Sequence, residues 1–404
     1  KKKERQYHIV DIMLQQVQTL AETQELWGEL ETLEDEKKNK ELKELLIQLI
    51  DTCRSPRFTL EFDEEYYPEK DVQDLLRNLG FFDVAFEVYN LLESIEEDDN
   101  GDIGKSGENV VEIVLLCNQL MYWFLLENSA NQELAFRKLD FFLGTLDENI
   151  QSHRVIKAIF KGNESLMTQC HREKIGEVGD LISKNGFLQP YLTLLTSITY
   201  VGERNVNENQ YEIVKQLTVP TRIQKVMLYL CPVTDPSYQE KIAKMEVYKD
   251  SKDDIDIEEL DPSIAYHITL MEVLAGCTVG RLNITTIEAK VQTIFAYKDI
   301  IDALRDPRTT LIARTRMSMY FYNAIIEVEM RVSGLEKTLS LWKLIETYPA
   351  VFEKSKDELR IVEKFGWNNP NVSRQRIEYM LVCVMITGGF FGHYYVSGSA
   401  GIRG

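Results

Sequence analysis

Apolar residues recur at intervals of three and four positions through most of this 404-residue chain, as in Ile9, Ile12 and Met13. This spacing places them on one face of an α-helix. Helix starts are marked as well, because Asp261 and Pro262 supply an N-cap and a first-turn proline for a long helix. Successive helices joined by short loops predict an all-α fold with negligible strand, an armadillo-like helical array or α-solenoid.

Two acidic runs interrupt this pattern and divide the chain. We interpret them as linkers, because blocks of like charge repel one another and bury little apolar surface. The expected organisation is an N-terminal helical region (1–95), a linker (96–105), a helical domain (106–249), a second linker (250–260), a C-terminal helical repeat region (261–391) and a mobile tail (392–404).

The first acidic run is similar to a calcium-binding loop in composition but not in spacing. If Gly101 is the invariant glycine of an EF-hand, the last position of the loop falls on Gly107. An EF-hand needs a bidentate glutamate there. We therefore favour a solvated linker over a weak cation site.

The composition narrows the functional classes. The chain carries 46 Lys and Arg against 65 Asp and Glu, a formal net charge of -19. Binding to nucleic acid or to an anionic membrane is disfavoured, because both need an excess of basic side chains. With 21 Gly and 10 Pro for turns, a many-stranded β-sandwich or propeller is disfavoured too.

The cysteines are scattered without a C-x-x-C pair, mostly within apolar stretches. We interpret them as buried thiols of a reducing compartment and not as a disulfide framework. They are Cys53, Cys117, Cys170, Cys231, Cys277 and Cys383.

The most apolar stretch of the chain runs from Tyr379 to Val396. Its uninterrupted apolar part ends at Ile386, because Thr387 and two glycines follow. A membrane-spanning helix needs ~20 apolar residues. The stretch therefore predicts a buried C-terminal helix and no membrane span in this chain.

The sequence contains no catalytic, cofactor-binding or metal-ligating constellation. A G-x-S-x-G nucleophile elbow does not occur. Cys170 and His171 are adjacent, so they cannot lie on one helical face as a pair of metal ligands would. His267 is interpreted as partly buried and hydrogen-bonded, with a pH- or ligand-sensing role as the alternative. The aromatic run Tyr320 to Tyr322 is interpreted as core.

Short motifs follow one another in a defined order along the chain. The first set comprises Asn131-Gln132, the block that contains Ile159, Phe160, Gly162 and Asn163, the pair Tyr191-Leu192 and the pair Asn209-Gln210. The second set includes Tyr266, His267, Glu272, Leu274, Cys277 and Gly280, and continues with Glu288, Asn323, Glu327 and Glu329. From Val72 to Phe352, this arrangement resembles the homology domain shared by inositol trisphosphate receptors and ryanodine receptors, together with the helical region that follows it.

The resemblance implies a family of large, homotetrameric, ligand-gated calcium-release channels of the endoplasmic reticulum. In that family armadillo-like domains relay ligand occupancy to a distant pore. The chain would be a cytosolic regulatory domain without enzymatic activity or cofactor, and its partners would be the other domains and subunits of the channel. The motif positions would have structural or coupling roles. The family's β-trefoils, pore helices and selectivity filter have no counterpart here, so no ligand or calcium residue is carried over.

Two other classes stay open on the residues alone. One is an armadillo- or HEAT-type adaptor that binds partner proteins in a concave groove, and the other is an all-helical enzyme. The chain begins at Lys1 without an apolar leader, which we interpret as the start of an excised piece. Basic residues are interpreted as solvated helix faces and not as a phosphate pocket, the most prominent being Lys298, Arg305, Arg308, Arg314 and Arg316.

Overall fold

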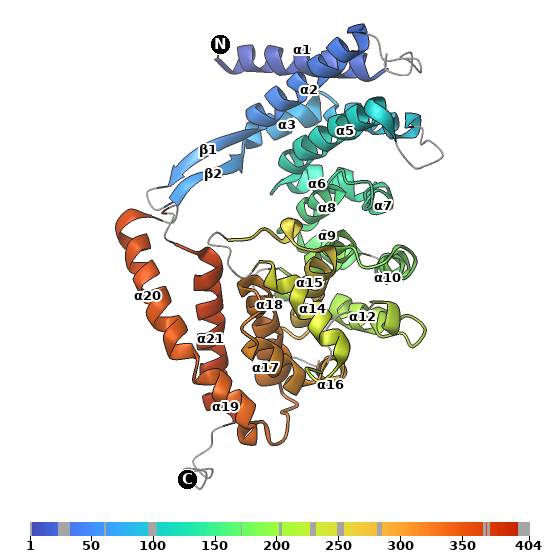
Figure 1. The fold of residues 1–404 in the computed structure, drawn as a ribbon. Coiled ribbons are helices and arrows are strands. Elements are labelled where there is room, and N and C mark those ends of the chain that lie inside the picture. Colours follow the sequence, from blue (N-terminus) through green and yellow to red (C-terminus); the bar gives the residue numbers. More distant parts are fainter. Residues whose placement is uncertain are drawn as a thin grey trace. The chain divides into compact units, whose positions relative to one another are not determined.

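The protein is analysed as a computed structural model that describes residues 2–22, 33–59, 62–95, 103–170, 172–201, 204–226, 232–248, 254–280, 285–366, 369 and 372–394. The chain divides into two compact units, one of residues 1–58 and 64–169 and one of residues 59–63 and 170–404. Helices make up most of each unit (Figure 1). The predicted all-α helical array is confirmed.

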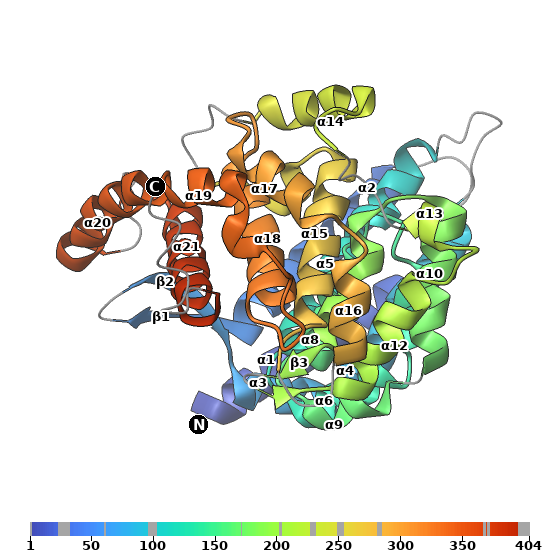
Figure 2. The ribbon, with the colours of Figure 1, turned by 90° about the horizontal axis from the view of Figure 1, so that it is seen from below.

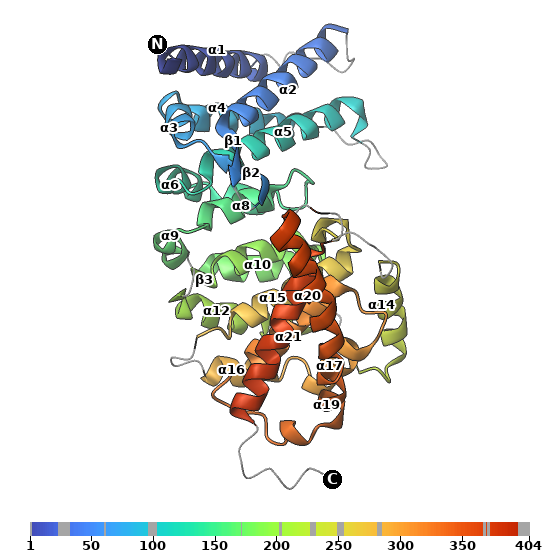
Figure 3. The same cartoon turned by 90° about the vertical axis from the view of Figure 1, so that its left-hand side faces the viewer.

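The first unit stacks helices in layers. Its helices are α1 (Lys2–Glu22), α2 (Leu33–Cys53), α3 (Lys70–Asn78), α4 (Phe81–Asn90), the 3-10 helix Leu91–Ser94, α5 (Gly104–Leu125), α6 (Ser129–Phe136), α7 (Leu139–Gly144), α8 (Ser152–Phe160) and α9 (Glu164–Gln169). Helix α2 packs on α5, and α5 packs on α8 (Figure 3). Between α2 and α3, strands β1 (Arg54–Thr59) and β2 (Phe62–Pro68) pair in a two-stranded sheet that the apolar pattern did not predict.

A hydrogen-bonded tyrosine lies in the core of the first unit. Tyr89 of α4 is 1% exposed, and its ring packs against Phe141 with 4.9 Å between ring centroids. Its hydroxyl donates to Asn118 Oδ1 of α5 at 2.8 Å, and Asn118 Nδ2 donates to the carbonyl of Ile150 at 2.7 Å. Burial raises the pKa of Tyr89 well above its ordinary value. This chain of bonds satisfies polar groups that would otherwise be buried without partners.

The second unit is larger and irregular at several helix ends. It contains α10 (Arg172–Asn185), the 3-10 helix Gln189–Leu192, α11 (Thr193–Ser197), β3 (Tyr200–Val201), β4 (Arg204–Asn205), α12 (Asn207–Leu217), α13 (Ile223–Val226), α14 (Pro236–Glu246), the 3-10 helix Ile257–Glu259, α15 (Pro262–Gly276), α16 (Thr285–Gln292), α17 (Tyr297–Arg305), α18 (Leu311–Phe321), the π-helix Tyr322–Ile326, the 3-10 helix Leu335–Lys337, α19 (Leu339–Ile345), α20 (Tyr348–Phe365) and α21 (Arg374–His393). Strands β3 and β4 form a short antiparallel hairpin.

Helix α15 is the centre of the second unit (Figure 2). Apart from Glu272, every residue from Ile264 to Gly276 is buried, as expected for a helix that is apolar on all sides. The predicted cap is confirmed, because the Asp261 carboxylate accepts a hydrogen bond from the backbone N–H of Ser263 at 2.9 Å. Burial raises the pKa of Asp261, but hydrogen bonds from Ser263 outweigh it and bring the pKa below its usual value.

The predicted buried C-terminal helix forms, but only one of its faces is buried. Helix α21 packs on α18 and α20 through residues such as Ile386 and Phe390. On its other face Leu381 and Val384 are 53% and 52% exposed. In the part of the chain that the structure describes, no helix combines the length and the apolarity needed to cross a membrane. The helix reaches His393, so the start of the expected tail is helical.

Five of the six cysteines lie in described segments, and each of them is buried and free: Cys53, Cys117, Cys170, Cys277 and Cys383. Burial raises the pKa of Cys53 and Cys117 to about 12. The reactive thiolate is therefore suppressed at neutral pH. Cys231 and much of both acidic runs (96–102 and 249–253) lie outside the described residues.

Tyr89→Phe tests the core of the first unit. The substitution leaves Asn118 Oδ1 buried without its donor, so we expect a loss of about 1–3 kcal/mol in the free energy of unfolding. Urea denaturation followed by circular dichroism measures it. The matched control is Tyr7→Phe, whose side chain is 49% exposed. Equal effects of the two substitutions would contradict this interpretation.

Candidate functional site

The predicted pair Asn131-Gln132 lies in α6 and connects it to neighbouring helices. Gln132, the fourth residue of α6, is 2% exposed. Its Nε2 donates to the carbonyl of Ala158 at 2.9 Å and to that of Lys161 at 3.0 Å, at the C-terminal end of α8. Asn131 Nδ2 donates to the carbonyl of Phe124 near the end of α5 at 2.7 Å. Because the last carbonyls of a helix lack partners within the helix, these amides complete both helix ends.

Two further motif residues close this arrangement. Gly162 follows Lys161 with a φ of 72°, the left-handed conformation that commonly ends a helix. Asn163 Nδ2 then donates to Gln132 Oε1 at 2.9 Å, while its Oδ1 accepts from the N–H of Leu166 at 3.2 Å and caps α9. We call this arrangement an amide lock: a buried glutamine, fourth in a short helix, whose amide donates to two carbonyls at the end of a later helix.

A second amide lock precedes it in the chain. Gln73, the fourth residue of α3, donates to the carbonyls of Trp123 at 2.7 Å and Leu126 at 2.9 Å, at the end of α5. Glu127 follows with a φ of 58°. Asn128 Nδ2 then donates to Gln73 Oε1 at 3.2 Å. The two locks share the same spacing of acceptors, the left-handed residue and the asparagine.

A third amide lock holds the end of α15. Gln210, the fourth residue of α12, donates to the carbonyls of Gly276 at 2.9 Å and Val279 at 3.2 Å. Gly280 follows with a φ of 92°, and the Asn205 side chain occupies the space where a β-carbon of residue 280 would lie. Residue 281, at the place of the asparagine, is outside the described segments. Within those segments Gln210 Oε1 has no hydrogen-bond partner.

Helix α16 carries a related contact in which the side chain accepts hydrogen bonds instead of donating them. Its fourth residue is Glu288, which is 1% exposed. A carboxylate can only accept, and Glu288 Oε2 accepts from the backbone N–H groups of Glu329 at 3.2 Å and Met330 at 3.3 Å. The predicted position Glu329 and its neighbour Met330 are thus held by a residue equivalent in position to the three glutamines.

The remaining motif residues of the core are apolar or satisfied. Those that are buried include Ile159, Phe160, Tyr191, Leu192, Tyr266, Leu274 and Cys277. The hydroxyl of Tyr266 donates to the carbonyl of Val226 at 2.7 Å. His267 was expected to be partly buried, but α15 is enclosed and His267 is 0% exposed, beside the ring of Phe295. These positions have the features of packing and not of a binding pocket.

Three predicted positions lie nearer the surface. Glu272 pairs with Arg316 at 3.6 Å. Asn323 lies half-buried in the π-helix that follows α18. Glu327, just after that π-helix, pairs with His393 at the end of α21 at 2.9 Å. The structure therefore separates these side chains from one another and brings none of them into a common pocket with the amide locks.

The basic series is paired and not simply solvated. Arg308 donates to Asp306 at 2.7 Å, and its hydrogen bonds bring the pKa of Asp306 below its usual value. Arg305 pairs with Asp302 at 3.7 Å, and Arg314 donates to the backbone carbonyl of Asp306 at 2.9 Å. The interpretation as a solvated face was therefore incomplete, because Arg308 and Arg314 are half-buried and engaged, whereas Arg305 is exposed as expected.

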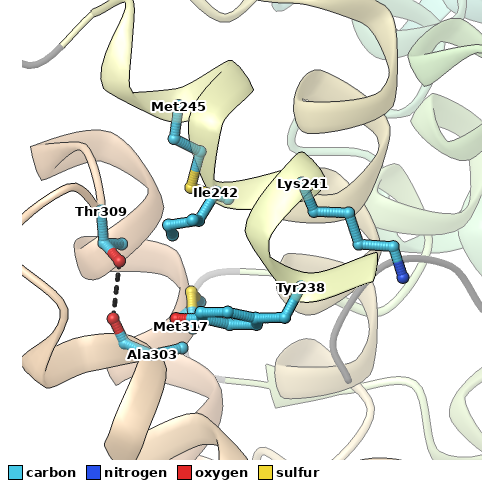
Figure 4. A pocket seen from close by; sticks show the side chains of 7 residues that line it. All are labelled: Tyr238, Lys241, Ile242, Met245, Ala303, Thr309 and Met317. Carbon is cyan, nitrogen blue, oxygen red and sulfur yellow. Dashed lines mark hydrogen bonds between the residues drawn. The ribbon is translucent and has the colours of Figure 1, made fainter. Parts of the chain in front are cut away.

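A small pocket lies beneath α14 (Figure 4). It is lined by Tyr238, Lys241, Ile242, Met245, Ala303, Thr309 and Met317. The hydroxyl of Thr309 is already used, because it donates to the carbonyl of Ala303 at 2.6 Å. Across the described ranges, no group of three His, Cys, Asp or Glu could hold a metal ion.

Comparison with known proteins shows which proteins the segment that contains the amide locks is similar to. Residues 43–223 match the family model of the RIH domain, RYDR_ITPR. The chain is also 23% identical over 230 residues to the inositol 1,4,5-trisphosphate receptor itr-1 of Caenorhabditis elegans. Residues 43–223, less than half of the chain, are thus similar to the RIH domain. The predicted resemblance of the chain to the inositol trisphosphate and ryanodine receptors is confirmed.

The alignment covers 56% of this chain but only 7% of the worm receptor. The matched segment, residues 43–223, contains the first two amide locks entirely. It also contains the glutamine of the third, whereas the acceptors of that lock, Gly276 and Val279, follow the matched segment. The third lock therefore ties the matched segment to the helical region after it.

Sequence reasoning identified Gln210 and Asn163 but not the repetition that explains them, and it missed Gln73. The glutamine and its first acceptor are 50 residues apart for Gln73, 26 for Gln132 and 66 for Gln210, so no fixed period appears in the sequence. The available signal was local: a glutamine at the fourth position of a short helix and, in the first two locks described, an asparagine two residues after the second acceptor.

Gln132→Met tests whether the amide lock stabilises the matched segment. The substitution preserves volume but leaves two carbonyls and Asn163 Nδ2 without this partner, so we expect a loss of about 2–4 kcal/mol in the free energy of unfolding. Urea denaturation measures it. Gln169→Met, at an exposed position of α9, is the control, with an expected change within about 0.5 kcal/mol. Similar small losses for both would show that the lock is dispensable.

Proposed function

We propose that this chain is a cytosolic regulatory and coupling domain of a ligand-gated calcium-release channel. The observation that carries the proposal is the RIH match over residues 43–223. The similarity to the worm inositol 1,4,5-trisphosphate receptor supports it. The channel would lie in the endoplasmic reticulum membrane as a homotetramer, with this chain on its cytosolic face.

The amide locks suggest how such a domain would transmit a signal. Each lock fixes the end of one helix against a short helix through directional hydrogen bonds in a buried setting, where an unpaired amide is costly. A displacement of one helix would therefore move its locked neighbour instead of being absorbed between them. Coupling between distant sites needs contacts of this kind, which have discrete arrangements.

The partners proposed for the chain are the other domains and subunits of the same channel. The engaged arginines around Asp306 support a role as relay and not as ligand sensor, because a polyphosphate ligand needs a convergent cluster of uncommitted basic groups. The family comparison gives a receptor and not an enzyme family.

The relay is tested in the full-length channel to which we propose that this chain belongs, with inositol trisphosphate as the ligand because the chain is similar to the worm receptor. We expect Gln210→Met to leave the Kd for labelled inositol trisphosphate within about twofold, because the residue has no contact with ligand, and to reduce calcium release at saturating ligand several-fold. Gln169→Met is the control. Both quantities are measured on the same microsomes. Unchanged calcium release would contradict the relay. A large increase in the Kd would show that Gln210 has a ligand-binding role instead.

One observation favours a second candidate, an adaptor that binds partner proteins. The outer face of α21 exposes Leu381, Val384 and Phe391, which lie on one side of the helix. If the chain is an adaptor, it assembles with no channel subunit. Polar substitutions at these positions should then abolish partner binding. A coupling domain predicts that the chain co-purifies with the channel.

A further inference from the structure

The C-terminal end of α21 is fastened to the segment that follows the π-helix. The hydroxyl of Tyr394 donates to the carbonyl of Ile325 at 2.9 Å and accepts from the N–H of Val332 at 3.2 Å. Arg331 donates to the backbone carbonyl of His393 at 2.8 Å. These three bonds hold the helix end against residues 325–332 whatever the charge of the histidine.

One contact in this fastening carries a titratable group. His393 Nε2 lies 2.9 Å from Glu327 Oε2, and the two side chains are 27% and 23% exposed. A carboxylate only accepts, so the histidine nitrogen is the donor. Protonation of the second ring nitrogen then turns a hydrogen bond into an ion pair in a partly desolvated site.

The surroundings of His393 favour its charged form. It is the last residue of α21, where the unpaired carbonyls of the helix end attract a cation. On the segment packed against it, Glu327, Glu329 and Glu336 are acidic, and Arg331 and Lys337 are basic. The other elements packed on α21 are the π-helix with Tyr322, α18 with Arg314 and Arg316, and α20 with Glu353, Lys354, Lys356, Asp357, Glu358, Arg360, Glu363 and Lys364. On α16, Glu288 is acidic and Lys290 basic, and on α19 Lys343 is basic; the charged groups of α21 itself, Arg374, Arg376 and Glu378, lie at its other end. Glu327 is in direct contact with the ring.

We propose that His393 and Glu327 form a proton-sensitive latch that tightens the end of α21 onto residues 325–332 as pH falls through the neutral range. The loop side of the latch is itself anchored, because Glu288 holds the N–H groups of Glu329 and Met330. Histidine is the side chain whose ordinary titration lies between pH 5 and 8. The latch would thus make the placement of α21 respond to acidification, independently of the proposed function.

Hydrogen exchange on the full chain tests the latch. Between pH 7.5 and pH 6, after correction for intrinsic rates, we expect amides of residues 388–394 to become about two- to fivefold better protected, the range of a half-exposed ion pair at a helix end. His393→Gln keeps a donor for Glu327 and removes the titration, so the gain should disappear. Glu327→Gln keeps an acceptor and removes the charge, and should have the same effect.

His153→Gln is the matched control, because His153 lies on α8 in the other unit and its loss should leave the pH response intact. A response that survives in His393→Gln would overturn the proposal. A response that is lost in His393→Gln but kept in Glu327→Gln would also overturn it, because the histidine would then act on the helix end alone.

Discussion

A buried carboxamide has to find partners on both of its sides, and this requirement organises the structure. Gln132 meets it by donating to two helix-end carbonyls and accepting from Asn163, and Gln73 meets it in the same way. In both locks the acceptor helix ends four positions before the next helix begins, at Leu125 and Ser129 for Gln73 and at Phe160 and Glu164 for Gln132. The amide lock therefore fixes both the packing of the helices and the register of the connection.

The locks also explain which motif residues matter and why. Gly162 and Gly280 adopt the left-handed conformation that lets the chain leave a helix directly under the amide. Asn163 both closes the lock and starts the next helix. At Glu288 the same position carries a carboxylate and holds N–H groups instead of carbonyls. Gln132, Gly162, Asn163, Gln210 and Gly280 are thus parts of one repeated arrangement.

Features of the fold that depend on residues close together in the sequence could be predicted from local rules. The cap at Asp261 and the apolar helix after it follow from residue types a few positions apart, and so does the all-α fold. The locks join residues 26 to 69 positions apart, and no local rule links Gln73 to Leu126 or Gln210 to Val279. The pairing of His393 with Glu327 escaped prediction for the same reason, since it spans 66 positions.

A double-mutant cycle between Gln132→Met and Asn163→Ala tests the amide lock most directly. The loss of the helix cap at Asn163 occurs in both arms of the cycle and cancels, so the coupling free energy reports the bond between the two amides. The lock predicts that the double variant is about 1–2 kcal/mol more stable than the sum of the single losses implies. Losses that add to within about 0.3 kcal/mol would contradict it, because the two residues would then act independently.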